Sequence, residues 1–309
     1  MKQIQRLKQF VEKHERPLVV ILGATAAGKT AISLNIARSI GGEILSTDSR
    51  QIYKHMPIST DIILPEQMEG VPHHMLAYAE PDEVITLAEY KEKALQTIED
   101  IYRRDHFPML VGGTGLYISA IIDNYDIPKS EPDLKLRKEL ENLAEKEGNQ
   151  AVHDILKKMD PQAAEQIHPN NLRYVIRAIE INKVTGKNKS QQKKSSNFDL
   201  YMIGIDRPRQ EIYERINKRV DQQRDSGLIE EVRALLEKGF SEDLPSMTSL
   251  GVKEIIPYIK GEMELDDCLE ILKRNTRRYA KRQMTWLKRY DNVNWLNTEQ
   301  IEQILKENA

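Results

Sequence analysis

The chain has a single cysteine, Cys268, among its 309 residues. One cysteine excludes an internal disulfide and a zinc site built from several cysteines, and it is typical of a reduced, cytosolic environment. No apolar run approaches the ~20 residues that cross a bilayer. The first 15 residues carry Glu12 and Glu15 and lack the apolar core of a signal peptide. We therefore expect a cytoplasmic globular protein without a membrane partner, in keeping with 39% hydrophobic and 30% charged residues.

The net charge is also small, at −2, but the cations are unevenly distributed. No acid interrupts the segment 273–289, whose cations are Lys273, Arg274, Arg277, Arg278, Lys281, Arg282, Lys288 and Arg289. Residues spaced by three and four from Leu269 to Trp286 predict a helix with one face toward the core and the cations on the flanking faces. Such a helix favours a polyanionic partner, because unpaired cations along ~25 Å of helix repel one another. A second basic cluster is either a solvated loop or part of the same surface; it contains Lys187, Lys189, Lys193 and Lys194.

The most specific motif lies near the N-terminus. It reads Gly23-Ala24-Thr25-Ala26-Ala27-Gly28-Lys29-Thr30, directly after the apolar run 18–22 and before a helical pattern. Glycines allow successive backbone N–H groups to point inward around a diphosphate, Lys29 adds a point charge, and the Thr30 hydroxyl can ligate Mg²⁺. The motif predicts a diphosphate site without specifying which molecule carries the diphosphate.

Strand patterns alternate with helical patterns along most of the chain. The predicted strands are 18–22, 43–46, 109–111, 200–205 and 293–296, and a helix is predicted over 87–102. This alternation predicts an α/β fold, a P-loop-type core in which helices flank a parallel sheet. The interval 125–197 is charged and carries only helical periodicity, at 134–143, 151–159 and 172–181. We therefore expect a core of residues 1–124 and 198–309, interrupted by an all-helical insertion domain at 125–197.

Two other predicted strand ends carry polar groups. Asp48 follows the second strand and could ligate Mg²⁺ through water, act as a general base, or cap the next turn. The strand at 109–111 runs into the glycine turn 112–115, which contains Thr114, where an ordinary ATPase would tend to have an Asp. This difference argues against a simple ATP hydrolase.

At the level of motifs the chain resembles the tRNA dimethylallyltransferases (tRNA isopentenyltransferases), in particular the bacterial type. The matching motifs cover nearly the whole chain in the correct order: Thr25-Ala26-x-Gly28-Lys29-Thr30, Asp48-Ser49-x-Gln51-x-Tyr53, Val71-Pro72-His73-His74, Gly112-Gly113-Thr114-Gly115-Leu116-Tyr117, Arg173-x-x-x-Arg177-Ala178-Ile179-Glu180, Leu250-Gly251-Val252-Lys253-Glu254 and Lys281-Arg282-Gln283-Met284-Thr285-Trp286-Leu287. The resemblance implies transfer of a dimethylallyl group from dimethylallyl diphosphate to N6 of the adenosine immediately 3′ of the tRNA anticodon. Mg²⁺ is implied as cofactor.

The resemblance also implies roles for individual residues. Residues 23–30, with Lys29 and Mg²⁺, would hold the leaving diphosphate, Asp48 would take the proton from N6, and Thr114 could hold the base in line. Arg215 and Arg219, one helical turn apart, are candidates to contact the diphosphate, or alternatively to pair at the surface with Glu211 or Glu214. The tRNA-contacting residues implied by position are Asp48, Ser49, Arg50, Gln51, Thr114, Arg137, Arg173, Arg177, Ser249, Leu250, Gly251, Val252, Lys253, Glu254, Arg278, Lys281, Arg282, Gln283, Trp286 and Lys288.

The chain departs from the family pattern in one loop. After Tyr53 the pattern has a segment such as Ile-Gly-Thr-Ala-Lys, whereas this chain has Ile58-Ser59-Thr60-Asp61-Ile62. If the loop touches the donor or the tRNA backbone, the changes at Ser59, Asp61 and Ile62 could lower affinity. No zinc-finger extension of the kind seen in eukaryotic relatives is present, which points to the bacterial type.

Two other functions remain open at this stage. A small-molecule or nucleotide kinase would use the same phosphate loop but should carry an arginine-rich lid, and the basic groups here lie far downstream. A non-catalytic tRNA-binding protein would use the loop as a structural switch. Changing Asp48 to Asn separates this possibility from an enzyme, in which turnover should be lost and tRNA affinity kept. We expect the protein to be a monomer.

Overall fold

The computed structural model describes residues 2–125, 127, 133–185 and 195–306. The chain divides into two compact units, one formed by Met1–Ile122 with Asn197–Ala309 and the other by Asp123–Ser196. The lysine cluster Lys187, Lys189, Lys193 and Lys194 lies outside the described residues. In the part of the chain that is described, no helix is both long and apolar enough to cross a membrane.

The first unit is built on a six-stranded sheet in which every pairing is parallel. Its order is β3-β2-β4-β1-β5-β6, with strands β1 (Pro17–Gly23), β2 (Gly42–Ser46), β3 (His73–His74), β4 (Phe107–Gly112), β5 (Asp199–Ile205) and β6 (Val293–Leu296). The five strands expected from the sequence are confirmed. The strand β3 was missed, because two residues are too few to show a period of two.

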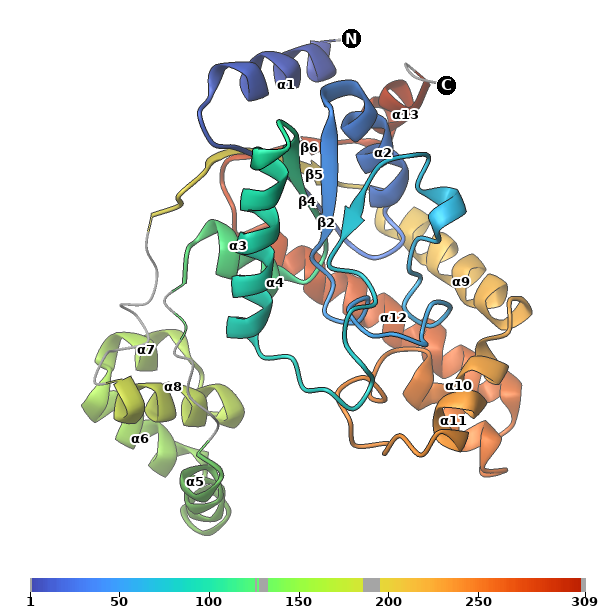
Figure 1. Cartoon of the computed structure of the whole chain (residues 1–309). Helices are drawn as coiled ribbons and strands as arrows, with labels where there is room; N and C mark the ends of the chain where they lie inside the picture. The colour runs from blue at the N-terminus through green and yellow to red at the C-terminus, as the bar shows by residue number, and fades with distance from the viewer. Residues whose placement is uncertain (1, 126, 128–132, 186–194, 307–309) are drawn as a thin grey trace. The chain divides into compact units, whose positions relative to one another are not determined.

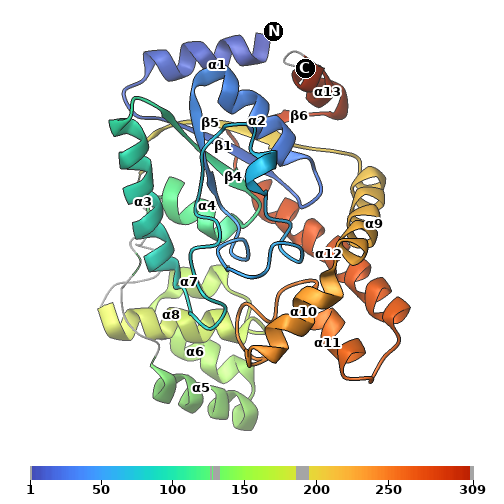
Figure 2. The ribbon, with the colours of Figure 1, turned by 45° about the vertical axis from the view of Figure 1, so that its right-hand side comes forward.

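Helices cover both faces of this sheet (Figures 1 and 2). The helices of this unit are α1 (Lys2–Lys13), α2 (Lys29–Ile40), α3 (Leu87–Arg103), α4 (Gly115–Ile122), α9 (Arg209–Asp225), α10 (Leu228–Glu237), α11 (Val252–Ile259), α12 (Leu265–Leu287) and α13 (Thr298–Lys306), with a short 3-10 helix η1 (Pro65–Gln67). Side chains of β1 alternate between two hydrophobic clusters. Leu18 and Val20 join the cluster that includes α3, α4 and α10–α12, whereas Val19 and Ile21 join the cluster that includes α1, α2 and α13. The predicted α/β fold class is thereby confirmed.

The carboxyl ends of parallel strands lie at one edge of a sheet, which is where open α/β folds bind ligands. At this edge β1 ends at Gly23, β2 at Ser46 and β4 at Gly112. The segments that follow these three strands are the phosphate loop, the Asp48 segment and the glycine turn. The fold thus brings the three most informative motifs of the sequence to the same edge.

The long basic helix predicted at 273–289 is α12, which begins earlier, at Leu265, and ends at Leu287. No acidic residue lies between these cations in the sequence, but in the fold two acidic residues from other parts of the chain pair with them. Lys273 Nζ lies 3.0 Å from Asp221 of α9, and Lys288 Nζ lies 3.2 Å from Asp206. Arg278, Lys281 and Arg282 are exposed, and none forms an ion pair with an acid among the described residues.

The second unit is all-helical where it is described, with α5 (Leu134–Glu147), α6 (Asn149–Met159), α7 (Pro161–Gln166) and α8 (Leu172–Thr185). These helices enclose their own hydrophobic cluster, centred on Leu140, Val152, Leu156, Val175 and Ile179. Because the cluster is separate from those of the sheet, this unit has a core of its own.

Candidate active site

The phosphate loop lies between the end of β1 and the first residue of α2. Its curvature depends on two residues with positive φ, Ala26 at 62° and Gly28 at 95°. A Cβ atom at Gly28 would make only ordinary contacts with Arg215 and Arg207, at 3.6 and 3.7 Å, so it is the positive φ and not lack of space that favours glycine here. The helix α2 begins at Lys29, and its first backbone N–H groups are free to bind an anion.

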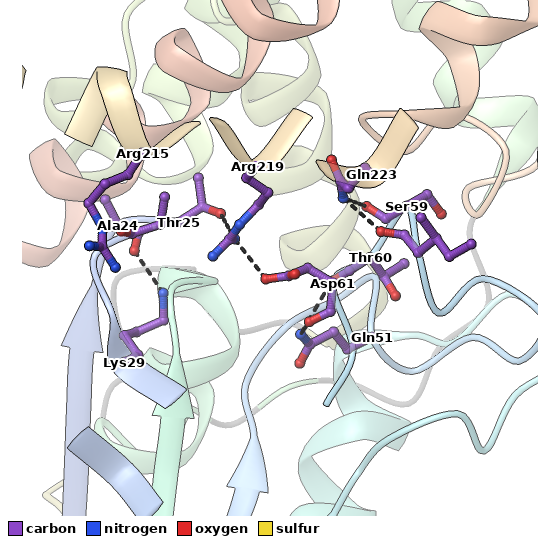
Figure 3. Close-up of polar contacts among 12 residues, drawn as sticks. Ala24, Thr25, Lys29, Gln51, Ser59, Thr60, Asp61, Arg215, Arg219 and Gln223 are labelled. Carbon is purple, nitrogen blue, oxygen red and sulfur yellow. Dashed lines mark hydrogen bonds and ion pairs between the residues drawn. The ribbon is translucent and has the colours of Figure 1, made fainter. Parts of the chain in front are cut away.

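Lys29 is held by the loop itself. Its ammonium group donates to the carbonyl oxygens of Gly23, at 3.1 Å, and Ala24, at 2.8 Å (Figure 3). Burial, together with the nearby charge of Arg219, lowers the pKa of Lys29 to about 8. Because these two hydrogen-bond partners are neutral carbonyls, no carboxylate is bonded directly to Lys29 and its positive charge faces the loop.

Three arginines contact the same loop through hydrogen bonds. Arg207 Nε donates to Ala27 O at 2.8 Å, Arg215 Nε donates to Ala26 O at 2.7 Å, and Arg219 Nη1 donates to Thr25 Oγ1 at 3.1 Å. Figure 3 shows Arg215 and Arg219 reaching from α9 toward the loop. The alternative of surface pairing with Glu211 or Glu214 is therefore wrong for these two side chains; it is Arg207 that pairs with Glu211.

Arg207 was not identified from the sequence. It follows β5, which pairs with β1 in the sheet, so its position after the strand end could have indicated a side chain near the loop. Together, Lys29, Arg207, Arg215 and Arg219 make the loop a strongly positive cradle.

A cavity of about 720 Å³ opens beside the cradle. It is lined by Gly28, Thr30, Arg215, Arg219 and Asp61, among others. Thr30 is exposed at the start of α2, so its hydroxyl is accessible from this cavity. The cavity therefore brings the Thr30 hydroxyl together with the cations of Arg38, Arg215 and Arg219 and the carboxylates of Asp61 and Glu69.

Asp48 and Thr114 lie at the neighbouring strand ends. Asp48 Oδ1 accepts a hydrogen bond from Arg50 N at 2.9 Å, which is the local turn contact considered for it from the sequence. Thr114 N donates to Thr47 O at 3.2 Å, and Thr114 Oγ1 accepts from Ser49 N at 3.3 Å. The Asp48 charge favours the protonated form of Lys29, so the two groups are electrostatically coupled. The structure therefore brings Lys29, Asp48 and Thr114 into one site.

Inward-facing residues of the helix α12 contact the phosphate loop and the glycine turn of this site. Gln283 Oε1 accepts a hydrogen bond from Thr25 N at 2.8 Å. A Cβ at Gly113 would lie 2.3 Å from Gln283 Nε2, and a Cβ at Gly115 would lie 2.0 Å from Trp286. Only glycine permits this close approach, which explains the glycine turn. Gln283 is buried and does not belong to the exposed basic face, whereas Trp286 is half-buried and lies at its border.

Tyr279 is a second residue of this site that the sequence did not identify. Burial raises its pKa to about 12, as does the charge of Asp48, while a hydrogen bond with Thr114 opposes the increase. From the sequence, Tyr279 belonged to the apolar stripe of the helix and carried no sign of a polar role. Tyr279 is thus coupled to both the predicted base and the predicted positioning residue.

The exposed face of α12 carries a second cavity, of about 590 Å³. It is lined by Arg278, Lys281, Arg282, Thr285, Trp286 and Arg289. The guanidinium of Arg289 lies 4.7 Å from the centre of the Trp286 ring, a cation–π distance. Four of the predicted tRNA-contacting residues therefore share one concave basic surface.

The segment after β2 and the segment at 249–254 are mostly engaged in structure. Arg50 donates to the carbonyl of Pro245, and Gln51 Nε2 donates to Asp61 O at 3.0 Å. At 249–254, Ser249, Gly251, Val252 and Glu254 are buried and Leu250 is partly buried. Glu254 accepts from Gly251 N at 2.9 Å, so the segment forms the start of α11, and only Lys253 is exposed.

In the helical unit, two of the three predicted tRNA-contacting arginines are ion-paired. Glu180 has no exposed side-chain surface, and it pairs with Arg137 at 2.8 Å and with Arg177. Burial alone would raise the pKa of Glu180, but these hydrogen bonds outweigh burial and lower the pKa to about 2. Arg173 is exposed on the same helix as Arg177.

The fold and the site define a class of protein. A parallel α/β core with a phosphate loop, no carboxylate at the end of β4 and a carboxylate after β2 is a P-loop protein adapted to a reaction other than simple ATP hydrolysis.

Comparisons with known proteins identify the family. The IPP transferase family model matches residues 51–290, more than half of the chain. The tRNA dimethylallyltransferase of Lachnoclostridium phytofermentans is 46% identical over 287 residues, covering 91% of this chain and 92% of its own. That of Acetivibrio thermocellus is 44% identical over 290 residues, covering 92% and 93%. This chain belongs to the tRNA dimethylallyltransferase (IPP transferase) family.

Solved structures agree with this assignment. The tRNA isopentenylpyrophosphate transferase of Bacillus halodurans is similar with a TM-score of 0.71 and 41% identity, and the match covers 95% of each chain. A eukaryotic dimethylallyltransferase acting on tRNA is similar with a TM-score of 0.81 and 30% identity, covering 96% of this chain and 77% of the other. The family resemblance noted in the sequence motifs is therefore confirmed.

Proposed function

We propose that this protein transfers the dimethylallyl group of dimethylallyl diphosphate to N6 of the adenosine immediately 3′ of the anticodon in tRNA, in the cytoplasm. The observation that carries the proposal is the meeting of a diphosphate cradle with a carboxylate and a hydroxyl at one sheet edge, namely Lys29, Asp48 and Thr114. The family assignment supports the same reaction.

The donor binds through its diphosphate. Backbone N–H groups of residues 26–30 surround it. Lys29 and Arg215 turn from neutral oxygens of the loop, and Arg219 from Thr25 and Asp61, toward its charged oxygens. Charge accumulates on the diphosphate as its bond to carbon breaks, so the same contacts are stronger in the transition state than in the ground state.

A magnesium ion fits this cradle in the manner of other P-loop sites. Thr30 would supply one hydroxyl ligand. Among the described residues no group of three or more His, Cys, Asp or Glu side chains could hold a metal, so diphosphate oxygens and waters would supply the remaining ligands, as Mg²⁺ prefers. Bound there, the ion would neutralise charge on the leaving diphosphate.

Asp48 is the general base of the proposed reaction. Its Oδ1 is held by Arg50 N, which leaves Oδ2 to face the substrate amine. The N6 nitrogen attacks the allylic carbon, the carbon–oxygen bond to the diphosphate breaks with its electron pair, and Asp48 takes one proton from N6. Thr114, fixed by Thr47 and Ser49, orients the adenine.

The tRNA is bound by the basic face of α12. Arg278, Lys281 and Arg282 contact phosphates of the anticodon arm, and the target adenine leaves the loop stack to enter the site. The helical unit, through Arg173 and other exposed cations, contributes further contacts to the same substrate.

The test is a transfer assay with radiolabelled dimethylallyl diphosphate, Mg²⁺ and unmodified tRNA whose anticodon loop contains consecutive adenosines. We expect label on the tRNA, and its loss when the target adenosine is replaced by guanosine. Transfer of phosphate from ATP to a small acceptor, with no label on the tRNA, would instead identify a kinase.

A further inference from the structure

The loop 57–62, in which the chain departs from the family pattern, is held in place by the core from several directions. Glu231 of α10 accepts hydrogen bonds from Ile58 N, at 2.7 Å, and Ser59 N, at 2.9 Å. Gln223 of α9 donates to Ile58 O at 2.7 Å, and Gln51 donates to Asp61 O at 3.0 Å (Figure 3). With its backbone fixed at both ends, the loop presents the Asp61 side chain in a defined direction.

That direction is toward the phosphate cradle. Asp61 Oδ2 lies 2.8 Å from Arg219 Nη1, and the same Arg219 nitrogen donates to Thr25 Oγ1 of the phosphate loop. Asp61 also lines the cavity that contains Gly28, Thr30 and Arg215. An internal carboxylate thus already satisfies one of the cations that would otherwise bind a diphosphate.

We propose that Asp61 determines donor affinity by competing with the diphosphate of the donor for Arg219. A carboxylate and a diphosphate oxygen are alternative anionic partners of one guanidinium, so the donor must displace the Asp61–Arg219 contact before Arg219 can bind it. The apparent dissociation constant of the diphosphate is raised by this competition. The inference rests on the proposed function, because it takes the cradle to be the donor site.

The backbone at Asp61 selects the variant for the test. Its φ is +52°, a left-handed conformation that Asn and Gly tolerate better than other residues. Asp61→Asn therefore removes the charge with little change in shape or backbone strain. Asp61→Gly removes the whole side chain and serves as a second variant.

A matched control removes a carboxylate from the same cavity at another place. Glu69 lines this cavity but pairs with Arg38 instead of a cradle residue. Glu69→Gln changes the charge of the cavity by the same amount as Asp61→Asn, but it frees Arg38, a lining residue outside the phosphate loop, instead of Arg219. It therefore separates the release of a cradle arginine from the loss of a carboxylate elsewhere in the cavity.

The experiment is titration of the intact protein with inorganic pyrophosphate in a calorimeter, with melting temperatures recorded for every variant. We expect Asp61→Asn and Asp61→Gly to bind pyrophosphate about fivefold more tightly than the wild type, and Glu69→Gln to change binding less than about twofold. In an Arg219→Ala background, Asp61→Asn should no longer tighten binding.

Unchanged or weaker binding by Asp61→Asn would overturn the proposal, as would an equal gain for Glu69→Gln. The outcome is separable from that of the proposed function. If Asp61→Asn binds pyrophosphate more tightly but no label is transferred to tRNA, the proposed function is rejected and the competition between Asp61 and the diphosphate is supported. If label is transferred but Asp61→Asn binds pyrophosphate as the wild type does, the function is supported and the competition is rejected.

Discussion

Two groups of arginines in this molecule differ in what they contact. In the first unit, Arg215 and Arg219 reach the phosphate loop and contact neutral oxygens there, and Arg219 also pairs with the exposed Asp61. In the helical unit, Arg137 and Arg177 converge on Glu180, which is fully buried. The first group keeps positive charge available for a ligand, whereas the second is neutralised to hold two helices together.

The comparison shows that an arginine in a family motif is not by itself a binding residue. Both Arg137, by its position, and Arg177, within a family motif, were assigned to tRNA contact from the resemblance, as were the exposed cations of α12. An arginine whose guanidinium is held by a buried carboxylate has less free charge to offer a phosphate. The predictions below test this division, beginning with the largest expected effect.

Among the variants that test this division, replacing Lys29 with Met should have the largest effect on catalysis. The variant removes the cradle charge that stabilises the leaving diphosphate, so kcat/KM for tRNA prenylation should fall by about 10³-fold. Stability should be kept, because Lys29 leaves behind only carbonyl oxygens and no buried opposite charge. Steady-state kinetics and a melting curve check both parts; a loss of stability similar to that expected for Glu180→Gln would contradict the division.

Replacing Glu180 with Gln should reduce the free energy of unfolding of the helical unit by about 3 kcal/mol, because Arg137 and Arg177 lose their shared partner. Glu139→Gln, on the exposed side of α5, is the matched control and should have little effect. Chemical unfolding of the intact protein, with amide exchange in the helical unit as the readout, measures the difference in the free energy of unfolding between the two variants.

The same carboxylate predicts an acid dependence with a definite sign. The pKa of Glu180 is about 2 in the folded protein, below its ordinary value of 4.5. Its contribution to stability is therefore complete above about pH 4.5 and is lost as the pH falls toward 2. The wild-type unit should lose this contribution over that range, whereas Glu180→Gln should lack this part of the pH dependence.

Reversing the charge of both Arg278 and Arg282 to Glu should weaken tRNA binding by at least about tenfold and reduce the salt dependence of the binding constant. Filter binding at several salt concentrations measures both. The control is the double reversal of Arg233 and Lys238, exposed cations of α10 and its end. Equal effects of the two double variants, or an unchanged salt slope, would show that α12 is not the main phosphate-binding surface.

The smallest effect is expected for the pH dependence of diphosphate binding. Since the pKa of Lys29 is about 8, its charge is lost as the pH rises through this value. The dissociation constant of pyrophosphate should rise about fourfold between pH 7 and pH 8.5 in the wild type. Lys29→Arg should remove most of this rise, and a profile identical to that of the wild type would assign the titration to another group.

The parts of the fold and site that follow from local pattern were predicted from the sequence. The strand that precedes the phosphate loop is a continuous apolar run, and the loop has a fixed spacing of glycines and a lysine, so the residue pattern alone locates both. The sheet edge then brought Asp48 and Thr114 to the loop, because parallel strands place their carboxyl ends together.

The parts that depend on side chains distant in the sequence were not predicted. Gln283 was expected to contact tRNA, not the phosphate loop, and Tyr279 had no predicted role, because spacing reports which face of a helix is buried but not what that face contacts. Glu180 lies in a recognised motif, yet nothing local shows that its carboxylate holds an arginine from α5. The same holds for Asp61, whose contact with Arg219 joins residues that are far apart in the chain.

The measurement that tests the central claim most directly is single-turnover prenyl transfer by Asp48→Asn, with tRNA and pyrophosphate affinities determined on the same preparation. If Asp48 is the base at the mouth of the cradle, the rate of transfer should fall by at least about 10³-fold while both affinities stay within about twofold of the wild type. Transfer at nearly the wild-type rate would contradict the account, since the proton of N6 would then have to leave by a route that does not involve this carboxylate.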